Sequence, residues 1–176
     1  LGVDELRYHD MYPPLLPSVE IKYGYEQGME EVTAALKPLG EAYQKQLAAG
    51  MAPGAGWVDV FPNKGKRTGA YMSGEAYDVH PYVLLNFDET YDDVSTLAHE
   101  MGHAMHSHLT NSTQPFQYAG YATFIAEIAS TFNETLLMKH VLDKTTDKDR
   151  RLYLLGEYME TFRTTVFRQA MFAEFE

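Results

Sequence analysis

The stretch TLAHEMGHAMHSHL, Thr96 to Leu109, places four of the chain's seven histidines within ten positions. In a helix each residue turns by about 100°, so His99 and His103 would lie about 40° apart on neighbouring turns. Glu100 completes the pattern His-Glu-x-x-His, in which two imidazoles bind one metal ion and the carboxylate takes a proton from its water. So short a motif also arises by chance, and it favours a metal site without establishing one.

The pattern around this motif predicts a helix that starts after a capping box at Thr90–Asp93 and runs to about Leu109. Its apolar positions fall within about 60° of one direction and would face the core. These are Val94, Leu97, Ala98, Met101 and Met105. The opposite side carries His99, His103 and His106. These histidines are therefore not expected in the core. A solvated polar face is the alternative, and it is the expectation for His108.

The residue types available limit the metal and its ligands. The chain has no cysteine, so a transition metal must be bound by histidine nitrogen and carboxylate oxygen. A catalytic zinc ion takes three protein ligands and keeps the fourth position open for water. One known zinc pattern supplies glycine and histidine three and six residues after the motif, but here those positions are His106 and Leu109. The third ligand must therefore lie elsewhere in the chain.

The segment from Phe124 to Leu142 offers that ligand. It is apolar nearly all the way round, which is typical of a buried helix, yet it carries Glu127 and Glu134 on one side. A buried carboxylate is costly unless it is paired or bound to a metal. We expect Glu127 to be the third ligand of one zinc ion per chain, with a structural ion pair as the alternative. Glu134 is expected either to orient a histidine by accepting a hydrogen bond from its free ring N–H, or to have a structural role. His106 is likewise expected to have a structural role or a role outside the ligand set.

The remaining pattern predicts a mainly α fold with a small β-sheet. Two helices between Gly24 and Gly50 break at Lys37-Pro38, because the residue before proline avoids helical geometry. Three short strands are expected at 57–61, 69–73 and 82–86, the first two joined by a hairpin-like loop. A last helix begins at a cap within 146–149 and reaches Glu176. The expected organisation is a single catalytic-core fragment with an N-terminal helical part (1–56), the small sheet (57–90) and the zinc-binding and C-terminal helices (91–176).

Two of these strands are candidates for binding a peptide by edge pairing. They are Gly69-Ala70-Tyr71 and Tyr82-Val83-Leu84. An ordinary buried sheet explains the same residues equally well.

Composition excludes several other functions. The net charge is −11, and the only basic cluster is Lys64-Gly65-Lys66-Arg67, which argues against binding nucleic acid. No apolar run approaches the roughly 18 residues that cross a bilayer, so no membrane association is expected. The lack of cysteine suits a reducing cytoplasm. Because the chain starts at Leu1 and shows no stop signal at Glu176, a fragment of a longer protein is expected.

Several motifs together resemble the oligoendopeptidase F branch of the thimet oligopeptidase family of zinc metallopeptidases. They are KGKRTGAYMSG, PYVLLNF, HEMGHAMH and FIAEIASTFNE, with LGVDELRYHDMYPPL and FRTTVFRQAMFAEFE at the two ends. The resemblance implies zinc bound by His99, His103 and Glu127, with Glu100 as general base. It implies a zincin-like part of a larger helical peptidase fold, whose channel admits short peptides. Family members carry a further His- and Tyr-rich substrate-binding segment, and this chain ends before it.

Three functional hypotheses follow. The first is a zinc-dependent endopeptidase for short peptides, of which this chain is a truncated core with low activity. The second is an exopeptidase with the same metal core. The third is a non-catalytic module with a closed zinc site, in which His106 would be the fourth ligand. Peptide preference and oligomeric state are not predicted.

Overall fold

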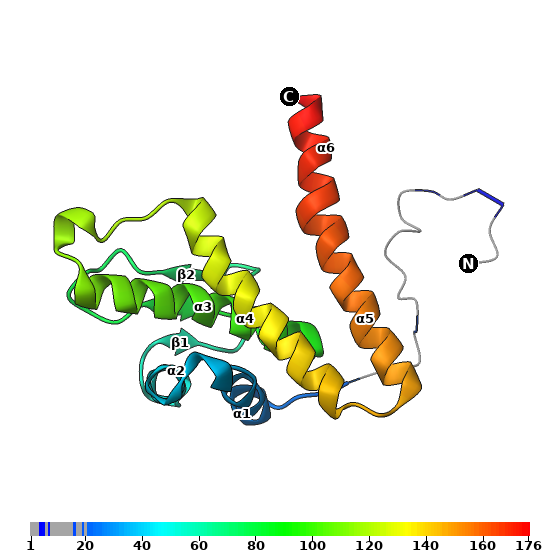
Figure 1. Cartoon of the computed structure of the whole chain (residues 1–176), viewed down its shortest axis with the longest axis horizontal. Coiled ribbons are helices and arrows are strands. Elements are labelled where there is room, and N and C mark those ends of the chain that lie inside the picture. Colours follow the sequence, from blue (N-terminus) through cyan, green and yellow to red (C-terminus); the bar gives the residue numbers. More distant parts are fainter. Residues whose placement is uncertain (1–3, 6, 8–15, 17–18, 20) are drawn as a thin grey trace. The chain divides into compact units, whose positions relative to one another are not determined.

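The computed structural model describes residues 4–5, 7, 16, 19 and 21–176. Most of the chain before Ile21 lies outside the described residues. The described part is mainly helical with a small sheet, which confirms the predicted fold class (Figure 1). It forms two compact units. The larger is Lys22–Val141 and contains every predicted site residue, and the smaller includes Leu142–Glu176. The predicted single-fragment organisation stays a prediction.

The first helices of the larger unit break where the sequence predicts. Helix α1 (Tyr25–Ala35) is followed by a short 3-10 turn, η2 (Lys37–Leu39), and by α2 (Glu41–Met51). Pro38 lies in the turn, where its missing N–H costs no helical hydrogen bond. Each helix presents an apolar face to the core, and Val32 and Leu47 are completely buried. Helix α1 packs against α3, the helix of the histidines.

The sheet has a different order from the one expected. Strands β1 (Val58–Asp59), β2 (Tyr71–Ser73) and β3 (Tyr82–Leu84) are arranged β1-β3-β2, with β3 parallel to β1 and antiparallel to β2. The predicted hairpin between the first two strands is therefore wrong. Strand β3 is central because its segment supplies the buried side chains, including Val83 and, just beyond it, Leu85.

The loop between β1 and β2 is closed by side chains instead of strand pairing. The Lys66 Nζ donates hydrogen bonds to the backbone oxygens of Asp59 and Phe61, at 3.0 and 2.8 Å. The Asn86 amide donates to the backbone oxygens of Arg67 and Gly69, each at 2.8 Å. These bonds hold the loop as it passes from β1, on one side of β3, to β2 on the other side.

Helix α3 (Tyr91–Thr113) begins as predicted and ends later than expected. The backbone N–H of Asp93 donates to Thr90 Oγ1 at 3.2 Å, and the backbone N–H of Thr90 donates to Asp93 Oδ2 at 2.9 Å, forming the capping box. The predicted apolar stripe is buried almost completely. It packs against α1 and the sheet, so the histidines are on the opposite side of the helix.

Helix α4 (Thr123–Lys144) follows a short turn, η3 (Phe116–Tyr118), and crosses α3 (Figure 1). The expectation that it is buried all round is wrong for its first half. Phe124 is 80% exposed and Ile128 is 55% exposed. Only one side of α4 faces α3, and that side carries the small or polar residues Ser130 and Asn133, which are buried.

The Leu142–Glu176 part of the smaller unit contains the predicted last helix and confirms it. It consists of α5 (Lys148–Phe162), a π-helical turn, η4 (Arg163–Phe167), and α6 (Arg168–Phe175). Asp147 caps α5, accepting from the backbone N–H of Arg150 at 2.9 Å. In the part of the chain that the structure describes, none of the helices combines the length and the apolarity needed to span a membrane.

Candidate metal centre

Helices α3 and α4 bring three potential ligand atoms together. The Nε2 atoms of His99 and His103 lie 3.1 Å apart, and Glu127 Oε2 lies 3.5 and 3.6 Å from them, respectively. Zinc bonds of roughly 2.0–2.1 Å at tetrahedral angles place neighbouring ligand atoms about 3.3 Å apart. The three atoms thus form a triangle of the size that one face of a zinc coordination tetrahedron requires. No other group of this kind occurs among the described residues.

Glu134 contacts the other nitrogen of His99. Its Oε1 accepts a hydrogen bond from His99 Nδ1, which leaves Nε2 directed toward His103 and Glu127. Burial lowers the pKa of His99, but the hydrogen bond and charge of Glu134, followed by the charges of Glu100 and Glu127, outweigh it and raise the pKa overall. This contact fixes the orientation of the ring and makes its Nε2 a better electron donor.

Glu100 is the most buried of the predicted site residues, at 7% exposed. Its Oε2 is buried and has no hydrogen-bond partner among the described residues. Burial raises the pKa of Glu100, the charge of His99 lowers it, and the charges of Glu127 and Glu134 raise it, with a net increase. A buried carboxylate oxygen without a partner is costly, and a carboxylate with a raised pKa is a stronger base.

His103 has the opposite shift. Burial and the charge of His99 lower its pKa, although Glu127 acts in the other direction. A lowered pKa keeps the imidazole neutral near pH 7, and the neutral ring is the form that binds a metal ion.

His106 does not join this group. Its ring stacks on Tyr121, with ring centres 4.1 Å apart and planes 15° apart. Tyr121 also hydrogen-bonds through its hydroxyl to Ser107, one residue further along α3. Burial lowers the pKa of His106. The sequence did not single out Tyr121 or Ser107, because no local pattern shows that the loop before α4 returns to α3.

His108 differs from its expectation. It is half-buried and its ring lies 5.4 Å from that of Trp57, so it is not simply on a solvated face. Glu127 also differs, because its side chain is 48% exposed, and the argument from a buried carboxylate does not apply to it. What places Glu127 is its helix: Asn133 of α4 donates a hydrogen bond to the backbone oxygen of Ala98, at 3.1 Å.

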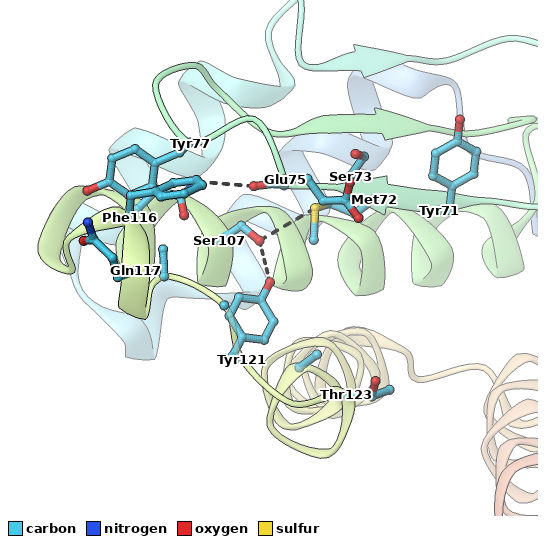
Figure 2. Close-up of a pocket in the computed structure, with 15 residues that line it drawn as sticks. Tyr71, Met72, Ser73, Glu75, Tyr77, Ser107, Phe116, Gln117, Tyr121 and Thr123 are labelled. Atoms are coloured by element: carbon cyan, nitrogen blue, oxygen red, sulfur yellow. Dashed lines mark hydrogen bonds between the residues drawn. The ribbon is translucent and has the colours of Figure 1, made fainter.

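A cavity of about 970 Å³ lies between β2 and the loop before α4, and its lining reaches Ala126, which precedes Glu127 in the chain (Figure 2). Tyr71, Met72 and Ser73 of β2 line one side, and Tyr121 and Ala126, next to Glu127, line another. Strand β2 is at an edge of the described sheet, whereas β3 is paired on both sides. Tyr82-Val83-Leu84 is therefore excluded as the peptide-binding edge. Gly69 and Ala70 precede β2, and Tyr71 begins it.

The chain is similar to several known proteins. Residues 18–176 match the model of Peptidase family M3. The whole chain is 46% identical to Oligopeptidase PepF of Bacillus subtilis and covers 26% of that protein. It is 44% identical to the oligoendopeptidase F homologue of Lactococcus lactis subsp. lactis and covers 29% of it. These relatives confirm the predicted resemblance to the oligoendopeptidase F branch.

The fold is also similar to solved structures. A provisionally described peptidase from Chlamydophila abortus is 43% identical, with a TM-score of 0.83 over 98% of this chain and 28% of that one. The structure titled PZ peptidase A with inhibitor 2 has a TM-score of 0.63 over 80% of this chain and 25% of that one, at 23% identity, and shows the fold alone. The chain thus spans between a quarter and a third of the length of these relatives. From its sequence and its fold, the chain belongs to peptidase family M3.

Proposed function

We propose that this chain carries the catalytic centre of a zinc-dependent endopeptidase that hydrolyses short peptides. His99, His103 and Glu127 would hold one zinc ion, and Glu100 would act as general base. The observation that carries the proposal is the triangle of ligand atoms, with sides of 3.1, 3.5 and 3.6 Å. Beside it lies a buried carboxylate oxygen that has no hydrogen-bond partner in the described part of the chain.

The side chains of this site support amide hydrolysis. Zinc in such a site supplies Lewis-acid chemistry, which makes water acidic enough to lose a proton near pH 7. Glu100 takes that proton, and its raised pKa suits it to return the proton to the leaving amine. Glu134 holds His99 in the tautomer whose Nε2 is free to bind the metal.

Strand β2 and the adjoining cavity support peptide binding. The free edge of β2 offers backbone groups to an extended peptide, and the cavity offers space for a side chain beside the metal centre. The lining is rich in aromatic residues, among them Tyr77 and Phe116, and its single charged residue is Glu75. An uncharged or basic peptide side chain therefore suits this cavity better than an acidic one.

The two other hypotheses make different demands on the site. A closed structural zinc would need a fourth protein ligand, and His106 stacks on Tyr121 outside the group of three. That geometry favours the open, catalytic site. An exopeptidase would use the same metal core, and the position of the bond cleaved in a peptide distinguishes it.

The isolated chain is proposed to bind zinc but to hydrolyse peptides slowly, since it spans only 26% and 29% of two of its relatives. Short substrates and a cytoplasmic location are parts of the same proposal.

The test begins with the zinc content of the purified chain after reconstitution. We expect about one zinc per chain, weaker binding in Glu127→Gln, and no change in His106→Ala. Glu100→Gln should keep its zinc and lose about 100- to 10,000-fold of whatever peptide hydrolysis the chain shows, because it removes the general base. Zinc that is lost in His106→Ala and kept in Glu127→Gln would contradict the proposal and favour a closed structural site. Mass spectrometry of the products separates internal cleavage from trimming at an end.

A further inference from the structure

We infer that Gly102 is a positioning residue: the absence of a side chain there lets α4 approach α3 closely enough for Glu127 to join His99 and His103. This inference rests on the proposed metal centre. It assigns a role to Gly102, the residue directly before the second histidine of the His-Glu-x-x-His motif. Its basis is the backbone geometry where the two helices cross.

The helices touch through backbone at Gly102. A Cβ atom built on Gly102 would lie 2.7 Å from Ser130 Cα, 2.8 Å from the Ala129 oxygen and 2.9 Å from Ser130 N. Ordinary van der Waals contact begins at 3.4 Å, so the nearest atom is 0.7 Å too close. All three atoms belong to the backbone of α4, and no side-chain rotation relieves the overlap. A methyl group at this position requires one helix to move.

The crossing lies between the contacts that build the metal centre. Along α3, Ala98 receives the hydrogen bond of Asn133, Gly102 touches Ser130, and His103 faces Glu127. Residue numbers rise on α3 as they fall on α4, so the helices run past each other in opposite senses. A shift of α4 at Gly102 therefore moves Glu127, which lies one turn away from Ser130.

Ser130 links this crossing to the carboxylate. Its Oγ donates hydrogen bonds to Glu127 Oε2 at 2.9 Å and to the Glu127 backbone oxygen at 3.1 Å. Ser130 is completely buried, so it has no space in which to move independently of its helix. Glu127 itself is half-exposed and has little packing of its own. Its position thus depends on the approach of α4, and the approach depends on Gly102.

Gly102→Ala is expected to lower zinc affinity by about 10- to 100-fold, the range seen when the groups that orient metal ligands are lost. The matched control is Gly28→Ala on α1. Its added Cβ would meet side-chain atoms of Val94 and Phe87, the nearest at 3.3 Å. Val94 belongs to the core side of α3, opposite the histidines, and Gly28 lies on α1, which carries none of the proposed metal ligands. Alanine is the better helix former at both positions, so helix propensity alone predicts no loss. Zinc affinity is measured by competition with a chromophoric chelator, and folding by circular dichroism.

The double variant Gly102→Ala/Glu127→Gln separates positioning from general loosening. If Gly102 acts through Glu127, the double variant should bind zinc no more weakly than Glu127→Gln alone. A Co²⁺-substituted Gly102→Ala chain should show the altered visible absorption of Glu127→Gln, whereas Gly28→Ala should show the wild-type spectrum.

A second variant covers the case in which Gly102→Ala fails to fold. Ser130→Thr keeps the hydroxyl and adds one methyl group at a fully buried position of the crossing, so a smaller loss of zinc affinity is expected. Wild-type affinity in a folded Gly102→Ala chain, or in Ser130→Thr if the former is unfolded, would overturn the inference and leave the metal centre intact. A wild-type chain that binds neither Zn²⁺ nor Co²⁺ would instead overturn the proposed centre, and the role of Gly102 with it.

Discussion

Helices α3 and α4 supply the proposed ligands of one metal centre, but the chain holds them in different ways. Helix α3 has a capping box at its start and an apolar face that is buried against α1 and the sheet. Helix α4 exposes large apolar residues along its first half, including Phe124 and Ile128, and meets α3 through Ser130 and Asn133. A packed core therefore places the histidine pair. Helix α4 buries Leu137, Met138 and Val141 in its second half, but the first half, which carries Glu127, is placed by a few specific contacts.

This difference predicts which substitutions should affect stability and which should affect metal binding. Hydrophobic burial is non-directional and spread over many contacts, so it holds α3 firmly without fixing any one atom. The second half of α4 is also held by burial, through Leu137, Met138 and Val141. Its first half, which carries Glu127, is fixed mainly by the close crossing at Gly102 and the hydrogen bond of Asn133. We expect variants on the core side of α3 to change stability, and variants at the contact between α3 and the glutamates of α4 to change metal binding.

The largest expected effect is on the core side of α3. Leu97 is fully buried, so Leu97→Ala should lower the free energy of unfolding by about 2–5 kcal/mol through lost burial and a residual cavity. The control is Ile128→Ala on the exposed side of α4, expected to change it by no more than about 0.5 kcal/mol. Urea unfolding followed by circular dichroism measures both. Equal losses would show that α4 is as tightly packed around Ile128 as α3 is around Leu97.

The next effect is on metal binding through α4. Glu134→Gln weakens the hydrogen bond that orients His99, so zinc affinity should fall by about 10- to 100-fold, or about 1.4–2.7 kcal/mol. Glu30→Gln, an exposed change on α1, is the control and should bind zinc like the wild type. Chelator competition measures both. If Glu134→Gln kept wild-type affinity, Glu134 would be merely structural.

A smaller effect is expected at the start of α3. Thr90→Ala removes the hydroxyl that accepts the Asp93 N–H, which should lower the free energy of unfolding by about 1 kcal/mol. Thr135→Ala on α4 removes an exposed hydroxyl that donates to the backbone oxygen of Thr131 in the preceding turn, so it should have almost no effect. Thermal unfolding compares the two. Zinc affinity should stay unchanged in both, and a loss in Thr90→Ala would mean that the cap also positions the histidines.

The smallest effect is on the exposed helix α5. The hydrogen bonds and charge of Arg163 lower the pKa of Glu160. The pair therefore stabilises the helix above the unfolded carboxyl pKa of about 4.3 and ceases to do so as the pH falls through the lower folded value. Glu160→Gln should cost a few tenths of a kcal/mol at pH 7, because the pair is largely solvated, and nothing near pH 2. Amide hydrogen exchange of α5, corrected for pH, measures this. A loss of helix stability in Glu160→Gln that persists near pH 2 would show that the charge of Glu160 is not its cause.

The sequence alone predicted the elements and most members of the candidate site. Helical periodicity, the cap at Thr90 and the proline after Lys37 are local features, because helices are formed by contacts between residues three and four apart. The spacing of His99 and His103 on one face follows from the same geometry. The residues of the site were thus predictable one helix at a time, although their roles stay predictions until metal binding is measured.

Tertiary structure decided what depends on residues far apart in the chain. The sheet order, with β3 central, is set by which segment buries the most apolar surface and not by the loop between β1 and β2. The distances between Glu127 and the two histidines are set by the approach of two helices at Gly102, and the position of His106 by a loop that brings Tyr121 against it. Such contacts leave no periodic pattern in a sequence, because each depends on the packing of two segments that form independently.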